Sequence, residues 1–297
     1  GCGDQIFSIV YSIIAFLPVI LTPEISKLYV SEKKEDLSNT IVVSIILSCI
    51  LSVVSLFLYQ YSEVITSLFV SDNTPVFYKA VEYVKFRSIA MPFCLVNGVI
   101  FSIFRGLLDF NKAIEINILT QIVNLILDPF FMIKYGVKGV AIASVISEIL
   151  CTLGYIHILL KKKLVKTKQK IYRFREITQR FMKLGVFLQI KFLLVNTIYI
   201  LINKKLLLID SSGSQLAAHI LICKFLSITT ILYKGLSTTC SSILPIEIVK
   251  NQDYEMKKRL LFWTHVTAII QTAIYLNIRF ILGFFTKDQH IIDICKK

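Results

Sequence analysis

Apolar residues occur along the chain in long blocks that short polar stretches separate. The blocks recur about every 25 to 40 residues, and most are close to the ~20 residues that a helix needs to cross a hydrocarbon core. Lys224, Lys234 and Gly235 interrupt one long block, which we expect to form one span with an amphipathic extension. The pattern predicts eight membrane-spanning helices, at 5–22, 39–60, 88–104, 113–133, 139–160, 184–202, 216–248 and 260–285.

The composition supports an all-α, polytopic membrane protein. Hydrophobic residues make up 55% of the 297 positions, and the mean hydropathy is +0.71. A water-soluble globular protein must cover itself with polar groups, so it cannot be this apolar. We therefore expect a multi-pass protein in a lipid bilayer.

Positive charge is concentrated in one loop. Ten of the 33 Lys and Arg residues lie in 161–183. Because such residues accumulate in cytoplasmic loops, this segment and the loops alternating with it are predicted to be cytoplasmic. Those loops hold nineteen basic residues, against seven in the opposite loops. A nucleic-acid patch would be the alternative, but the segment has no ordered pattern of stacking aromatic residues, and we expect no nucleic-acid partner.

Two parts of the chain share an order of segments. The first part consists of a polar loop at 31–41, then a span, then the segment 65–85. The second part repeats this order with a loop at 249–261, a span and the segment 282–296. This order predicts two six-helix lobes in parallel, with the second lobe incomplete; chance similarity between apolar sequences is the alternative. Such repeats are common in transporters, which bind substrate between the halves. The predicted parts are an amino-terminal lobe (1–160), a cytoplasmic basic loop (161–183) and a partial carboxyl-terminal lobe (184–297).

No motif indicates catalysis or a metal. The seven cysteines are scattered without a CxxC motif, and the four histidines are isolated. There is no GxSxG elbow, no phosphate-binding glycine loop and no pair of carboxylates within a span. We predict that the protein is not an enzyme, with a membrane-embedded enzyme as a less favoured alternative. The chain begins with Gly and lacks signal-peptide features, so we expect a fragment.

One predicted span carries a polar stripe. In 113–133, polar residues spaced by four, three and four positions share one helical face, because a helix has 3.6 residues per turn. An unpaired polar group costs several kcal/mol in hydrocarbon, so this face must line a cavity or bond to another helix. The stripe comprises Asn117, Gln121, Asn124 and Asp128, and the residues left to face lipid or neighbouring helices are Ile118, Ile122, Leu125 and Ile126.

Asp128 is the most unusual residue of the stripe. An ionised Asp within a span costs about 2.5 to 3.5 kcal/mol on insertion scales. Asn124 can donate to the carboxylate or help to bind a cation, and Pro129 removes a backbone hydrogen bond and permits a bend. Together these residues predict a proton or sodium site. A structural carboxylate that bonds to a neighbouring helix, or reaches water at the outer interface, is the alternative.

Polar residues also interrupt the later spans. Gln189, Asn196 and Asn203 recur at intervals of seven, which suits a cavity wall and contacts between helices equally. Lys191, Lys224 and Lys234 either snorkel to the interface, bind an anion or form ion pairs. The residues that we predict to line a substrate cavity are Asn117, Gln121, Gln189, Asn196, Lys191 and Lys234.

Three segments carry a family resemblance. YVKFRSIAMP (83–92), FRGLLDFNKA (104–113) and NLILDPFFMIKYGVKGVAIASVISE (124–148) resemble the multidrug and toxic compound extrusion (MATE) transporters, most of all the plant-type branch. LAAH (216–219) resembles the opening of that family's eighth span, so the resemblance covers nearly the whole chain. The matching residues outside the coupling site include Arg87, Pro92, Arg105, Gly106, Asp109, Gly136 and Gly139.

The resemblance implies a two-lobe antiporter that exports organic cations or organic acids in exchange for protons or sodium. It implies that Asp128 and Asn124 form the amino-terminal cation-coupling site, with Ser144 in the place of a family threonine. The expected partners are a small-molecule substrate and the bilayer, with no cofactor beyond H⁺ or Na⁺, and a monomer. Lys234 stands where plant-type relatives tend to have an acid, which favours an anionic substrate. A lipid-linked precursor flippase and a non-transporting fragment are the alternatives.

Overall fold

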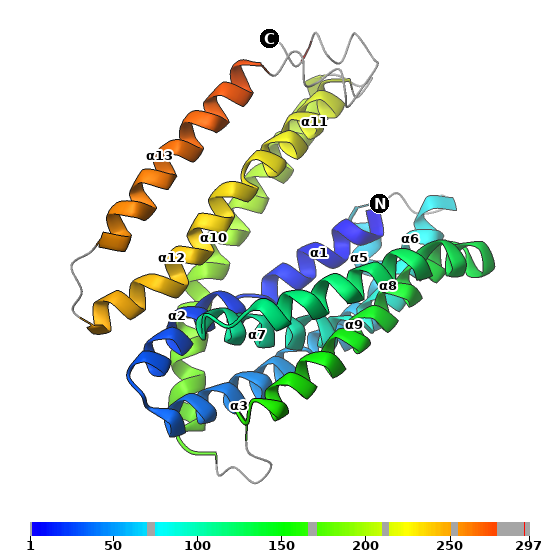
Figure 1. The fold of residues 1–297 in the computed structure, drawn as a ribbon. Helices are drawn as coiled ribbons and strands as arrows, with labels where there is room; N and C mark the ends of the chain where they lie inside the picture. Colours follow the sequence, from blue (N-terminus) through cyan, green and yellow to red (C-terminus); the bar gives the residue numbers. More distant parts are fainter. Residues whose placement is uncertain are drawn as a thin grey trace. The chain divides into compact units, whose positions relative to one another are not determined.

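The structure is a computed structural model that describes residues 2–69, 75–165, 171–209, 214–250, 255–277 and 294. Every regular element in these ranges is a helix, in agreement with the predicted all-α class (Figure 1). The chain divides into two compact units, residues 1–189 and 190–297. The predicted lobe boundaries stay a prediction, and the segment 282–296 of the predicted repeat lies almost wholly outside the described residues.

The helices follow the chain in simple order. They are α1 (Cys2–Ile14), α2 (Leu17–Val30), α3 (Lys34–Leu51), α4 (Val54–Gln60), α5 (Ser62–Ser67), α6 (Pro75–Ser88), α7 (Met91–Gly106), α8 (Asn111–Tyr135), α9 (Val137–Lys161), α10 (Phe174–Ile209), α11 (Ser214–Thr229), α12 (Ile231–Lys250) and α13 (Glu255–Leu276).

Several of these helices are long and apolar enough to cross a membrane. Five such stretches lie within the described ranges, and α6 with α7 forms a sixth candidate that is bent by 50°. The remaining predicted blocks, 216–248 and 260–285, contain no described helix of this kind. The five unbent stretches are Ile6–Val30, Lys34–Gln60, Asn111–Tyr135, Val137–Lys161 and Phe174–Tyr199.

The apolar block at 216–248 is not one continuous helix. It contains α11 and α12, which meet at Thr230. The Thr230 hydroxyl donates to the Ser227 carbonyl at 2.9 Å. Such a bond competes with the regular helical pattern, because a threonine side chain offers the backbone a local alternative partner. The boundary between the two helices therefore lies inside the predicted block.

The core of the first unit lies where α2, α3 and α7 pack together. Leu21, Ile25 and Ile103 are completely buried there. Ser26 of α2 donates its hydroxyl hydrogen to the carbonyl of Gly106 in α7, at 2.9 Å. A Cβ atom at Gly106 would lie only 2.8 Å from the Thr22 carbonyl oxygen. The two helices thus approach so closely that only glycine fits at this contact.

The outer face of α8 is apolar, as its sequence pattern predicts. Ile118, Leu125 and Ile126 are 55%, 72% and 64% exposed within the protein alone. Large apolar side chains on the surface of a spanning helix are suited to lipid contact. These residues were expected to face lipid or neighbouring helices, and their exposure within the protein agrees with a position toward lipid.

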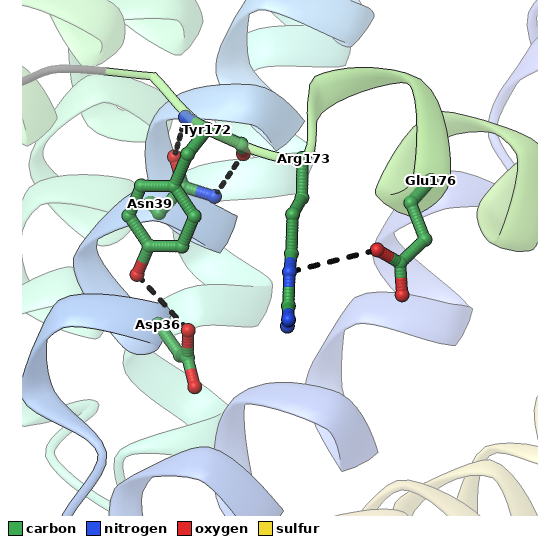
Figure 2. Close-up of polar contacts among 5 residues, drawn as sticks. All are labelled: Asp36, Asn39, Tyr172, Arg173 and Glu176. Carbon is green, nitrogen blue, oxygen red and sulfur yellow. Dashed lines mark hydrogen bonds and ion pairs between the residues drawn. The ribbon is translucent and has the colours of Figure 1, made fainter.

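Segments of the first unit that are predicted to be cytoplasmic contact one another and the start of α3. Lys162 forms an ion pair with Asp109, which joins the end of α9 to the α7–α8 loop. Asn39 of α3 donates to the Tyr172 carbonyl at 2.7 Å and accepts from the Tyr172 N–H at 3.1 Å (Figure 2). The Tyr172 hydroxyl donates to Asp36 at 2.9 Å. The connection that leads into α10 is therefore anchored on α3.

Candidate functional site

Two residues at the break between α6 and α7 help to form the site. Pro92 lies in the first turn of α7, where its missing N–H costs nothing. Arg87 lies in the last turn of α6, just before the break. Its guanidinium lies 4.5 Å from the ring centroid of Phe7 in α1, which is cation–π geometry. The bend thereby holds a cation beside α1 within the first unit.

A cavity of about 380 Å³ lies among α1, α6, α7, α8 and α9. This volume is within the range of about 300 to 1,000 Å³ that is typical of small-molecule sites. Aromatic and small residues share its walls with several polar groups. The polar side chains that matter most for its chemistry are Tyr11, Arg87, Asn97, Asn117, Gln121 and Glu148.

Two predicted residues of the α8 stripe line this cavity. Asn117 and Gln121 face it together with Thr120, a residue that is nearly buried. The Thr120 hydroxyl donates to the carbonyls of Ile116 and Asn117, at 2.9 and 3.0 Å. These two residues of the stripe line a polar cavity, as an intramembrane polar face is expected to do, although Gln121 is also partly open to the surface, and Asn124 and Asp128 lie outside the cavity wall.

Glu148 of α9 is a site residue that the sequence reasoning missed. The Asn97 amide donates to Glu148 Oε2 at 2.7 Å and to the Glu148 carbonyl at 3.0 Å. Thr152 donates to Asn97 Oδ1 at 2.8 Å. An acid in the middle of an apolar block is itself a signal of function, and the block at 139–160 contains this one acid.

Arg87 brings positive charge to the same cavity. Its Nε and Nη1 atoms are buried, and neither has a hydrogen-bond partner in the described part of the chain. Among the described residues it also forms no ion pair within 4.0 Å. A buried donor without a partner costs about 1 to 3 kcal/mol, and more when it is charged. The cavity thus contains an arginine that is available to an anionic group.

The predicted cation-coupling residues lie between α8 and α9. Asn124 Nδ2 is 3.5 Å from Ser144 Oγ, which is at the limit of a hydrogen bond. Asp128, one turn further along α8, has a buried Oδ1 atom with no partner within the described ranges. The Asp128 side chain is not part of the cavity wall. The structure brings Asn124 and Ser144 together, and Asp128 lies on the same helical face.

The later predicted cavity residues are not gathered into a described site. Gln189 has a buried Oε1 atom without a partner among the described residues. Lys191 and Lys234 are exposed in the second unit. The side chains of Asn196, Asn203 and Lys224 lie outside the described residues. Their assignment to a substrate cavity stays a prediction.

The remaining motif residues shape the scaffold around the site. Arg105 donates to Thr22 Oγ1 through Nη2 at 2.7 Å and through Nε at 3.1 Å. Gly136 has φ +64°, a left-handed conformation that favours glycine, and joins α8 to α9. A Cβ atom at Gly139 would lie 2.1 Å from the Phe131 carbonyl oxygen. These glycines hold α8 and α9 close enough for Asn124 to reach Ser144.

A second cleft, of about 660 Å³, lies between the start of α3 and the segment that leads into α10. Burial and the hydrogen bond to Asp36 raise the pKa of the Tyr172 phenol above its ordinary value. The cleft is open, and its acids and bases are equal in number, so its charges balance. Among the residues described, no group of three or more His, Cys, Asp and Glu side chains could hold a metal. Its charged residues are Glu32, Lys33, Lys34, Glu35, Asp36 and Arg173.

Comparison with known proteins gives sequence relatives among plant proteins. The model of the MatE family matches residues 1–130. Protein DETOXIFICATION 43 of Arabidopsis thaliana is 32% identical over 123 residues, which are 40% of this chain and 23% of that protein. Protein DETOXIFICATION 42 is 25% identical over 233 residues, 76% of this chain and 44% of the relative. The chain thus spans less than half the length of either plant protein.

Solved structures share the fold. A MOP superfamily transporter from Pyrococcus furiosus, described as having a binding pocket of reverse polarity, superposes with a TM-score of 0.85 at 20% identity. That match covers 99% of this chain and 68% of the other. An outward-facing multidrug resistance MATE transporter of the same superfamily gives 0.81 at 21% identity, covering 99% and 67%. The chain is thus similar to MATE proteins in sequence over part of its length and in fold over almost all of it, and its apolar helices are those of a multi-pass membrane protein.

Proposed function

We propose that the protein is a secondary active transporter that exports small organic molecules in exchange for protons or sodium. The observation that carries the proposal is the polar cavity of the first unit, which lies among helices with apolar outer faces. Polar and ionisable side chains are costly within a membrane, and they are found where an ion or substrate must pass. A purely structural bundle would gain nothing from Arg87, Asn117, Gln121 and Glu148 around one cavity.

The coupling site that we propose consists of Asp128, Asn124 and Ser144. The 3.5 Å approach of Asn124 to Ser144 supports it, because a bound cation needs oxygen ligands from more than one helix. The buried Asp128 Oδ1 atom without a described partner also supports it. Such an atom can accept a proton or contact a cation when the helices move.

Asp128→Asn tests this assignment. The amide keeps the size of the side chain but removes its negative charge, so gradient-driven export should fall to the level of protein-free vesicles. The measurement uses proteoliposomes with an imposed pH or sodium gradient, and follows ethidium as an organic cation and succinate as an organic acid. Insertion and thermal stability should be nearly unchanged.

Glu115→Gln is the matched control for loss of an acid from the same helix. Glu115 is exposed and pairs only with Lys112 at 2.7 Å, three residues away. Exposed pairs of this kind contribute little, so the control should transport like the natural protein. Normal gradient-driven transport by Asp128→Asn would refute the coupling role of this aspartate.

A further inference from the structure

Glu148 is placed to accept an ion, and it is not one of the motif residues described above. It lies near the middle of α9, eleven residues after the helix begins at Val137. Its carboxylate is the only one among the described residues that line the 380 Å³ cavity. The cavity wall therefore gives an entering proton one carboxylate to bind.

The neighbouring side chains fix how this carboxylate is held. Thr152 lies 2.8 Å from Asn97 Oδ1, which makes that oxygen the acceptor and turns the NH₂ group of Asn97 toward Glu148. The Asn97 amide then donates to Glu148 Oε2 at 2.7 Å. An amide donor stabilises the ionised carboxylate, and it contacts only one of the two carboxylate oxygens, each of which can accept a proton.

Groups that can ionise face the cavity from four of the five helices that form it, and α8 contributes none. The groups that can ionise are Tyr11 on α1, Arg87 on α6, Cys94 on α7, and Cys151 and Tyr155 on α9. Tyrosine and cysteine are neutral near pH 7, so Arg87 and Glu148 are the two charged side chains of the described wall. They share the cavity without forming an ion pair within 4.0 Å.

Because Arg87 and Glu148 do not form an ion pair, binding of a proton to Glu148 changes the balance of charge in the cavity. With Glu148 ionised, the charges of the cavity balance. When a proton adds to the carboxylate, Glu148 no longer offsets the charge of Arg87, whose two buried nitrogens without described partners attract an anion or repel a cation. Asp128 of α8, outside the cavity wall, is a further acid within electrostatic reach of Arg87. A proton and an organic cation would therefore exclude each other, which is the coupling that exchange requires.

We propose that Glu148 is the residue of the amino-terminal cavity that takes up the coupled proton, with Asn97 as its positioning residue. The proposal rests on the proposed function, and it adds a second acid that differs from Asp128. Protonation forms one O–H bond on the carboxylate, and release returns the proton to water on the other side of the membrane. No other reactant is needed.

The test combines two measurements on Glu148→Gln, Glu148→Asp and the exposed control Glu115→Gln. The first is infrared difference spectroscopy between acidic and neutral pH, which detects the carbonyl stretch of a newly protonated carboxylic acid. A band lost in Glu148→Gln, shifted in Glu148→Asp and kept in Glu115→Gln supports the proposal. The same band in all three variants overturns it. This readout does not depend on transport, so it stands even if no transported molecule is found.

The second measurement is transport driven by a pH gradient in proteoliposomes. Glu148→Gln should lose at least 10-fold in initial rate, Glu148→Asp should retain part of the rate, and Glu115→Gln should be unchanged. A natural protein without gradient-driven transport would refute the proposed function and leave the infrared result to decide about Glu148. A natural rate in Glu148→Gln, with the pH dependence unaltered, would refute the role of Glu148 alone.

Discussion

At the scale of single residues, the polar stripe of α8 was predictable because spacing alone determines which residues share a helical face. Asn117 and Gln121 line the cavity, and Asn124 approaches Ser144 of α9. Glu148 was not found by the same reasoning. Its role depends on Asn97, which is 51 residues away in α7, and on the contact between two helices that a single-helix pattern cannot reveal. A lone acid in an apolar block was the available signal.

The glycine at the α2–α7 contact gives a prediction at this scale. In Gly106→Ala the new methyl group would lie 2.8 Å from the Thr22 carbonyl oxygen, so the helices must separate. We expect a loss of about 1 to 3 kcal/mol in stability, as for other overpacked interiors. Thermal unfolding in detergent measures the loss.

Gly235→Ala is the matched control for an added methyl group. No atom outside the helix lies within 4 Å of the position that its Cβ would take. The helix should therefore tolerate the alanine, or gain slightly from its higher helix propensity. An equal fall in melting temperature for both variants would show that the close α2–α7 contact does not explain the effect.

At the scale of elements, the long apolar helices were the most predictable features. The predicted span 113–133 corresponds to α8 (Asn111–Tyr135), and the predicted span 139–160 corresponds to α9 (Val137–Lys161). The predicted span 88–104 corresponds to α7, which is only one helix of the bent pair. The other helix, α6, was not predicted as a span because it is too rich in charged residues to form an apolar block. The break at Thr230 was also missed, since the apolar block continues on both sides of it.

The attachment of the α9–α10 connection to α3 gives a prediction for an element. Asn39 is 1% exposed, and its side chain makes both hydrogen bonds to the Tyr172 backbone (Figure 2). Asn39→Ala should release the connection at a cost of about 1 to 3 kcal/mol, because buried backbone groups lose their partners. Limited proteolysis with trypsin should then cleave faster after Arg173.

Asn111→Ala is the control for this experiment, since Asn111 is exposed at the start of α8. Its cleavage rate should equal that of the natural protein. If Asn39→Ala were cleaved no faster than this control, the two hydrogen bonds would not hold the connection in place.

At the scale of the whole molecule, the membrane location and the all-α class followed from hydropathy, and the resemblance to MATE transporters followed from three short motifs. The fold agrees with transporters that are only about 20% identical in sequence. This is possible because spanning helices require apolar faces and close glycine contacts more than particular side chains. Substrate choice could not be predicted in the same way, because it depends on side chains that different parts of the chain contribute to a cavity.

The claim that an ion gradient drives export is tested most directly by reversing that gradient. Proteoliposomes that contain the natural protein are loaded with ethidium or succinate, and the pH or sodium gradient is imposed first in one direction and then in the other. We predict that net movement of the organic ion reverses with the gradient and stops when an ionophore collapses it. Movement at the same rate in both directions, unaffected by the ionophore, would contradict ion-coupled exchange.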